Sequence, residues 1–155
     1  MKILLICTGN LCRSPLAEGY LKKLLKDKDS SGVEISSAGL WAIEGNTVED
    51  DAYQVAAENG FDLSNHRSRL LKPEDVKEAS IILVMEYLQM REILITYPEA
   101  KEKVRLLRSF APDGAIQPDI DDPYGSGLQS YREFFKQIKE SIEGLFKYLK
   151  EHNKI

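Results

Sequence analysis

The segment Cys7–Pro15, with the sequence CTGNLCRSP, directly follows the short apolar run Ile3–Ile6 and precedes an amphipathic stretch. A buried strand over the apolar run would deliver Cys7 to the carboxyl edge of a sheet, where open α/β folds bind their ligands. Gly9 and Asn10 favour a tight turn after that strand, because both residue types tolerate backbone angles that most others avoid. The segment therefore predicts a strand, a turn and a helix in succession.

The expected helix begins within the same segment. Ser14 is expected to cap it, and Pro15 suits its first position because no backbone N–H is needed there. Such a helix points its unpaired N–H groups and the positive end of its dipole into the preceding loop. The turn is therefore predicted to bind an anion.

A thiol and a guanidinium share this loop. The thiolate is the reactive form of cysteine, and both helix N-termini and nearby cations favour it. The planar fork of Arg13 binds two phosphate oxygens at once. Cys7 and Arg13 thus predict a pocket for a tetrahedral oxyanion such as phosphate, with a nucleophile at its floor. The expected product of attack is a cysteinyl-phosphate, which water then hydrolyses.

A leaving alkoxide or phenolate needs a proton, so this chemistry requires a general acid elsewhere in the chain. The acidic stretch 119–125, DIDDPYG, supplies two candidates, Asp121 and Asp122. Pro123 pushes Asp122 towards an extended backbone, which would present its carboxyl group from a defined loop. Spacing alone leaves both aspartates open. Tyr124 could stack against an aromatic substrate ring beside the acid.

Four segments together resemble the low-molecular-weight protein-tyrosine phosphatase family: Cys7–Pro15, Ser37–Gly39, Leu63–Ser68 and Asp122–Tyr124. Their order matches the family and spans nearly the whole chain. The resemblance implies that Cys7 is the nucleophile, Arg13 the phosphate clamp and Asp122 the acid. It implies a set of loop-supporting residues: Asn10, Ser14, Ser37 and His66. It also implies a set of substrate contacts: Thr8, Gly9, Asn10, Leu11, Cys12, Ser14, Trp41 and Tyr124.

The substrate implied by this resemblance is a protein that carries phosphotyrosine. Family members that hydrolyse phosphoarginine carry threonine where this chain has Leu11, and an apolar side chain there favours an aromatic ester. Gly125 stands where many members have a second aromatic residue, which would open one wall of the cleft. Trp41 either compensates as the opposite wall or is a partly buried tryptophan that covers the edge of the sheet.

Three other functions remain as alternatives. A protein-arginine phosphatase would use the same loop. A thioredoxin-coupled arsenate reductase needs further cysteines, whereas this chain has only Cys7 and Cys12 and none around Val84–Tyr87. A non-catalytic phosphate sensor would keep the loop but has no need of Asp122.

Cys12 has two interpretations of its own. It is either a small packing residue behind the loop or a thiol that captures oxidised Cys7 as a disulfide. The cysteine content and the short apolar N-terminal run, which is too short for a signal peptide, indicate a reduced, cytoplasmic protein.

Composition narrows the possible partners. The chain has 155 residues and a net charge of −4, which argues against nucleic acid or an anionic membrane as a binding partner. His66 and His152 are too few and too far apart in the sequence for a metal site, so we expect neither a metal nor a cofactor.

The remaining pattern predicts an α/β fold, as a single domain over residues 1–155. Strands are expected over 2–6, 33–36, 80–84 and 103–107, and helices over 16–28, 48–59, 73–79, 87–97 and 128–150. Alternation of this kind implies a four-stranded parallel sheet with helices on both faces.

Overall fold

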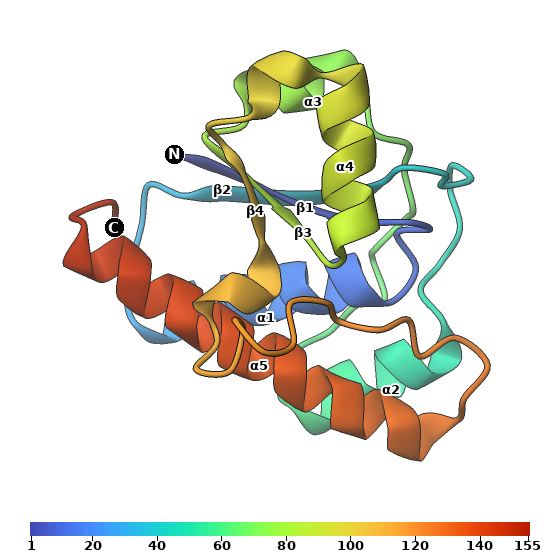
Figure 1. Ribbon diagram of the computed structural model, residues 1–155. Coiled ribbons are helices and arrows are strands. Elements are labelled where there is room, and N and C mark those ends of the chain that lie inside the picture. The colour runs from blue at the N-terminus through green and yellow to red at the C-terminus, as the bar shows by residue number, and fades with distance from the viewer.

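The computed structural model describes all residues, 1–155, and contains one parallel sheet. Its strands are β1 (Lys2–Cys7), β2 (Glu34–Gly39), β3 (Ile81–Val84) and β4 (Val104–Leu106), in the spatial order β2-β1-β3-β4. All three strand pairings are parallel, so the carboxyl ends of the strands lie along one edge (Figure 1). The predicted four-stranded α/β fold is confirmed.

Helices cover both faces of the sheet (Figure 1). One face carries α1 (Arg13–Asp27), α2 (Asp50–Glu58) and α5 (Leu128–Glu151), whose apolar residues share one core cluster. The other carries α3 (Pro73–Glu78) and α4 (Tyr87–Thr96), which share a smaller cluster. Two short 3₁₀ helices, η1 (Pro98–Ala100) and η2 (Leu107–Phe110), flank β4.

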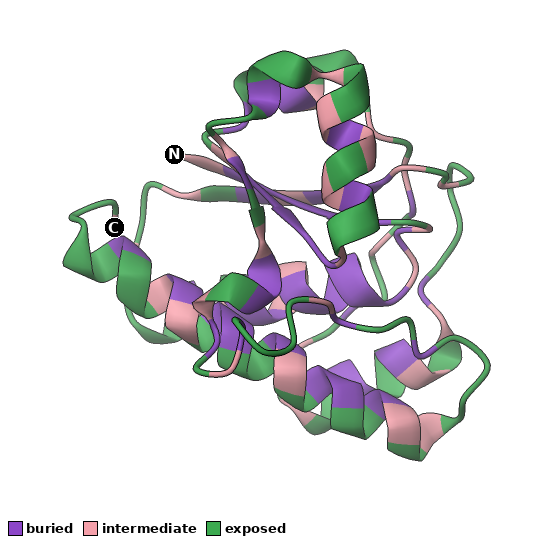
Figure 2. Cartoon of the chain, in the orientation of Figure 1, coloured by how far each residue is buried: buried purple, intermediate pink, exposed green.

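The sheet is buried on both sides, which explains why β1 is continuously apolar. Ile3, Leu5 and Cys7 face the larger cluster, whereas Leu4 and Ile6 face the smaller one. Figure 2 shows β1 and β3 mostly buried and exposed stretches on β2 and β4, while the outer faces of the helices are exposed. Burying one such aliphatic side chain stabilises the fold by about 1.5–3 kcal/mol before entropy is counted.

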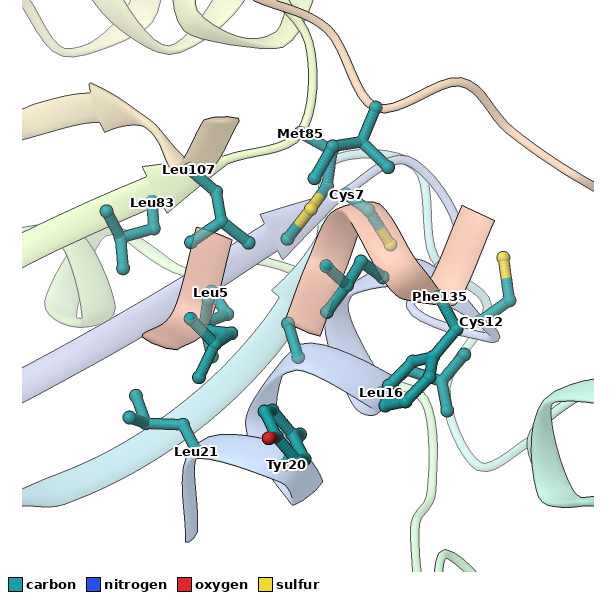
Figure 3. Packing of buried hydrophobic residues seen from close by; sticks show 14 of the residues in the cluster. Leu5, Cys7, Cys12, Leu16, Tyr20, Leu21, Leu83, Met85, Leu107 and Phe135 are labelled. Carbon is teal, nitrogen blue, oxygen red and sulfur yellow. The ribbon is translucent and has the colours of Figure 1, made fainter. Parts of the chain in front are cut away.

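The larger cluster holds the loop after β1 against the helices. Figure 3 shows Cys7 among the buried side chains of this cluster, with Leu16 of α1 close to Phe135 of α5. The ring of Tyr20 meets the ring of Phe135 edge-on, with 5.7 Å between the centroids and an interplanar angle of 85°. Helix α5 therefore braces α1, which begins directly after the loop.

The start of α1 differs from the prediction. The helix begins at Arg13, with Cys12 at the N-cap and no side-chain capping bond. Ser14 and Pro15 are thus the second and third helical residues, and their predicted roles at the cap and first position are wrong. Pro15 is tolerated because the N–H groups of the first turn have no helical partner.

Strand β2 runs three residues beyond its predicted end at position 36, and its last residue, Gly39, pairs with Cys7. A side chain on Gly39 would collide with the loop, because its Cβ would lie 2.6 Å from the carbonyl oxygen of Thr8. The other element boundaries lie within one or two residues of their predictions. No helix is both long enough and apolar enough to cross a membrane.

Candidate active site

The sulfur of Cys7 lies at the floor of the loop between β1 and α1. Cys7 is buried, with 2% of its surface exposed. The backbone N–H of Asn10 donates to the sulfur at 3.2 Å, and the hydroxyl oxygen of Ser14 lies 2.9 Å from it. Asn10 adopts the predicted left-handed conformation, with φ of 56°, which turns its amide towards the sulfur. These donors stabilise negative charge on the sulfur.

Gly9 has a different role from the one expected. It is not among the residues with positive φ, and a Cβ there would meet only the side chain of Leu11, at 3.9 Å. The curl of the loop is therefore made by Asn10. Gly9 itself does not have a positive φ, and the space around it would admit a side chain.

Asn10 organises the loop from a fully buried position. Its amide nitrogen donates to Ser14 Oγ at 2.8 Å and to Ser37 Oγ at 2.9 Å, while its Oδ1 accepts the backbone N–H of Arg69 at 3.1 Å. Ser37 in turn donates to Glu18 at 2.5 Å. The Ser14 oxygen accepts from Asn10, and when Cys7 is a thiolate the Ser14 hydroxyl is the donor in the contact between them.

His66 holds the opposite side of the same turn. Its Nε2 lies 2.8 Å from the carbonyl oxygen of Asn10, within hydrogen-bonding distance. The structure therefore brings together the four predicted support residues, Asn10, Ser14, Ser37 and His66, around one turn. No group of three or more His, Cys, Asp or Glu side chains is arranged to hold a metal ion.

The guanidinium of Arg13 is 2% exposed and is fixed from several sides. Its Nη1 donates to the carbonyl oxygen of Ile120 at 2.8 Å and lies 3.3 Å from a Glu86 carboxylate oxygen. Its Nη2 lies 3.6 Å from Asp122 Oδ2. Its buried Nε has no hydrogen-bond partner in the protein and is free to donate to an anion.

Asp122, and not Asp121, is the aspartate that contacts the loop. Its Oδ2 is paired with Arg13, and its Oδ1 accepts the N–H of Tyr124 at 3.1 Å and the thiol of Cys12 at 3.7 Å. No hydrogen bond or ion pair connects Asp121 with the Cys7–Pro15 segment. About half of the Asp122 side chain is exposed, so the group can exchange protons with solvent.

The backbone of Ile120 sets the position of Asp122. Its N–H donates to the carbonyl of Met85 at 2.8 Å, and its carbonyl accepts from Arg13. The side chain of Asp119 accepts the N–H of Tyr87 at 2.8 Å. The acidic segment is thereby fastened to the end of β3, beside the end of β1.

Cys12 is a buried thiol, with a relative exposure of 7%. Burial raises its pKa strongly, and negative charge on Cys7 and Asp122 raises it further, while Arg13 acts in the opposite direction. Both cysteines are free and buried, which agrees with the interpretation of Cys12 as a packing residue; the alternative, a disulfide with oxidised Cys7, stays a hypothesis.

Aromatic side chains stand at the outer part of the site. Trp41 and Tyr124 are each 70% exposed, and the N–H of Trp41 donates to the carbonyl of Thr8 at 3.0 Å. The interpretation of Trp41 as a partly buried cover of the sheet edge is therefore wrong. Leu11 is half-buried in the loop itself.

Two residues in contact with the loop were missed from the sequence. Glu86 pairs with Arg13, and Gln89, which is 3% exposed, donates to Thr8 Oγ1 at 3.2 Å while accepting the N–H of Met85. Their place in the sequence could have identified them, because both follow β3, whose carboxyl end lies at the ligand-binding edge of the sheet.

Three comparisons with known proteins agree with this geometry. A protein-arginine-phosphatase of Geobacillus stearothermophilus is 37% identical over 144 residues, 93% of each chain. The structure of a low molecular weight protein tyrosine phosphatase from T. tengcongensis has a TM-score of 0.88 at 35% identity, covering 96% of this chain and 99% of that one. Vibrio vulnificus Wzb, solved with benzylphosphonate, has a TM-score of 0.85 at 33% identity, covering 96% and 98%.

The family model described as low molecular weight phosphotyrosine protein phosphatase matches residues 2–155. That match spans the Cys7–Pro15 loop, the acidic segment and every element between them. The chain belongs to the low molecular weight phosphotyrosine protein phosphatase family, a family of hydrolases.

Proposed function

We propose that this protein hydrolyses phosphotyrosine in proteins by way of a phosphorylated Cys7. The observation that carries the proposal is the set of donors around one buried sulfur: the Asn10 amide at 3.2 Å and the Ser14 hydroxyl at 2.9 Å, with Arg13 on the same loop. Fixed donors of this kind stabilise the charge of a transferring phosphoryl group. Residues 1–155 act as a single catalytic unit in this proposal.

The first step transfers the phosphoryl group to sulfur. Cys7 Sγ attacks phosphorus, the bond from phosphorus to the phenolic oxygen breaks, and Asp122 gives its proton to that oxygen. Arg13 holds two of the remaining phosphoryl oxygens. The contact of Asp122 with Arg13 at 3.6 Å supports this role, because it keeps the acid beside the bound group.

In the second step Asp122 acts as a base and recovers a proton. Water attacks phosphorus, Asp122 takes a proton from the water, and the bond from sulfur to phosphorus breaks to release inorganic phosphate. The leaving sulfur accepts the hydrogen bond of Ser14, which supports departure of a thiolate.

The preference among substrates depends on Leu11 and on the aromatic side chains of Trp41 and Tyr124 at the outer part of the site. An apolar side chain in the loop packs against a phenyl ring, and the exposed rings of Trp41 and Tyr124 offer further contact. Phosphoarginine is the second candidate substrate, supported by the 37% identical relative that is named a protein-arginine-phosphatase. The free state of Cys7 and Cys12 supports a reducing compartment such as the cytoplasm.

A peptide panel tests the proposal. Peptides carrying phosphotyrosine, phosphoarginine or phosphoserine are compared in the presence of a chelator, with release of phosphate as the readout. We expect phosphotyrosine to have the highest kcat/KM, and Leu11→Thr to shift the preference towards phosphoarginine. Cys7→Ser is the control for the nucleophile. Turnover by Cys7→Ser equal to that of wild type would overturn the assignment of Cys7 as the nucleophile. A wild-type preference for phosphoarginine would overturn the assignment of phosphotyrosine as the substrate.

A further inference from the structure

A cavity lies at the amino ends of β1 and β3, at the opposite end of the sheet from Cys7. It has a volume of about 530 Å³, and it is bounded by the start of β3, by β4, by η2 and by the last turn of α5. Met1 and Lys154 both line it, and the two ends of the chain lie on the same side of the molecule (Figure 1). Its size is within the range of small-molecule pockets, about 300–1,000 Å³.

The cavity is electropositive in a chain whose net charge is −4. Its lining contains Lys103, Arg105 and Lys154 but only one carboxylate, that of Glu102. None of the ion pairs in the protein uses these three cations. Lys103 donates to two backbone carbonyls, so Arg105 and Lys154 are the cations with the most donor capacity left.

The last turn of α5 is shaped so that Lys154 borders the cavity. Asn153 adopts a left-handed conformation, with φ of 51°, and the N–H of Lys154 donates to the carbonyl of Leu149 at 2.9 Å. This Schellman-type ending satisfies helix carbonyls that would otherwise repel an anion. It also turns the chain back towards β4.

An aromatic wall completes the cavity. Phe110 and Tyr148 line it together, with their ring centroids 5.3 Å apart. Gly144 allows this contact, because a Cβ at that position would lie 1.9 Å from the carbonyl oxygen of Phe110. Helix α5 therefore lies directly against η2. Ser80 Oγ accepts the N–H of Lys2, which leaves its own proton free to donate into the cavity.

We propose that this cavity binds a small aromatic anion, a planar ring that carries a sulfonate, carboxylate or phosphate group. The ring packs against Phe110 and Tyr148, and the anionic group is held by Arg105 and Lys154. The site is separate from the Cys7 loop and does not depend on the function proposed for that loop.

The test is a titration with naphthalenesulfonate, followed by backbone amide chemical shifts. Orthovanadate is kept at saturation to occupy the Cys7 loop. We expect the shifts to move at Ser80, Arg105, Phe110 and Lys154, and to move little with a neutral naphthalene alcohol. Shifts confined to residues 7–14, or equal binding of the neutral ring, would overturn the proposal.

Two matched double variants distinguish specific binding in the cavity from nonspecific electrostatic attraction of the anion to the protein. Arg105→Gln with Lys154→Gln removes both anion contacts at exposed positions and should weaken binding about tenfold. The control, Lys136→Gln with Lys139→Gln, makes the same change in net charge on exposed positions of α5 outside the cavity and should leave the affinity unchanged. Equal weakening by both double variants would overturn the proposal.

Discussion

The Ser14 hydroxyl lies 2.9 Å from the Cys7 sulfur and accepts a hydrogen bond from Asn10, so it is placed to donate to that sulfur when Cys7 is a thiolate. Ser14→Ala should therefore slow release of the sulfur in the second step. We expect kcat to fall by about tenfold to a hundredfold with a smaller change in KM, and a burst of phenol in stopped flow. Ser31→Ala, at an exposed serine, is the control. An unchanged kcat in Ser14→Ala would contradict this role.

Arg13 binds through a planar fork that a lysine lacks. Arg13→Lys keeps the positive charge but removes the planar guanidinium, which can donate to the Ile120 carbonyl and to the anion at the same time. We expect kcat/KM to fall by about a hundredfold or more, measured with an aryl phosphate. Binding of vanadate should weaken in parallel. A loss of less than about threefold would show that point charge alone is sufficient.

Asp122 and Asp121 are adjacent, but only Asp122 contacts Arg13 and Cys12. Asp122→Asn should reduce the hydrolysis of phenyl phosphate by about a hundredfold or more, and that of p-nitrophenyl phosphate much less, because a good leaving group needs no proton. Asp121→Asn is the matched control and should behave as wild type. If Asp121→Asn showed the leaving-group dependence instead, the assignment of the acid would be reversed.

The buried Cys12 thiol makes stability depend on alkaline pH. Its pKa is raised in the folded protein, so above about pH 8.5 the unfolded chain loses this proton while the folded one keeps it. The free energy of unfolding should therefore fall, with a slope from this group that approaches about 1.4 kcal/mol per pH unit as the unfolded thiol becomes fully ionised.

The slope is measured by urea denaturation between about pH 8.5 and about pH 9.5, below the ordinary tyrosine pKa of about 10. Cys12→Ala should flatten it by that amount. Tyr20 and Tyr131, whose pKa values are also raised by burial, extend the decline to higher pH. Identical slopes for wild type and Cys12→Ala would rule out the Cys12 contribution.

Much of the fold followed from local patterns. The run Ile3–Ile6 is apolar at every position because both faces of β1 are covered, and the turn chemistry of Asn10 matches its left-handed backbone. The predicted start of α1 was wrong because serine and proline are typical of the first helix positions. Here the Ser14 side chain contacts Asn10 and Cys7 instead of capping the helix.

The contacts of Arg13 could not be predicted in the same way. Glu86 reaches Arg13 because β3 lies next to β1, although β2 intervenes in the sequence. Strand order is a property of the whole sheet, and spacing along the chain does not contain it. Spacing alone left Asp121 and Asp122 open for the same reason, because the position of each carboxylate depends on how the backbone of Ile120 is hydrogen-bonded to Met85 after β3.

The most direct test of the account is to stop turnover of an aryl phosphate within the first cycle and to locate the phosphoryl group by mass spectrometry. Acid-quenched wild type and Ser14→Ala should both carry phosphate on the peptide that contains Cys7, with more in Ser14→Ala, and Cys7→Ala should carry none. A burst of product with an unmodified Cys7, or phosphate on another residue, would contradict the central claim that this sulfur takes the phosphoryl group.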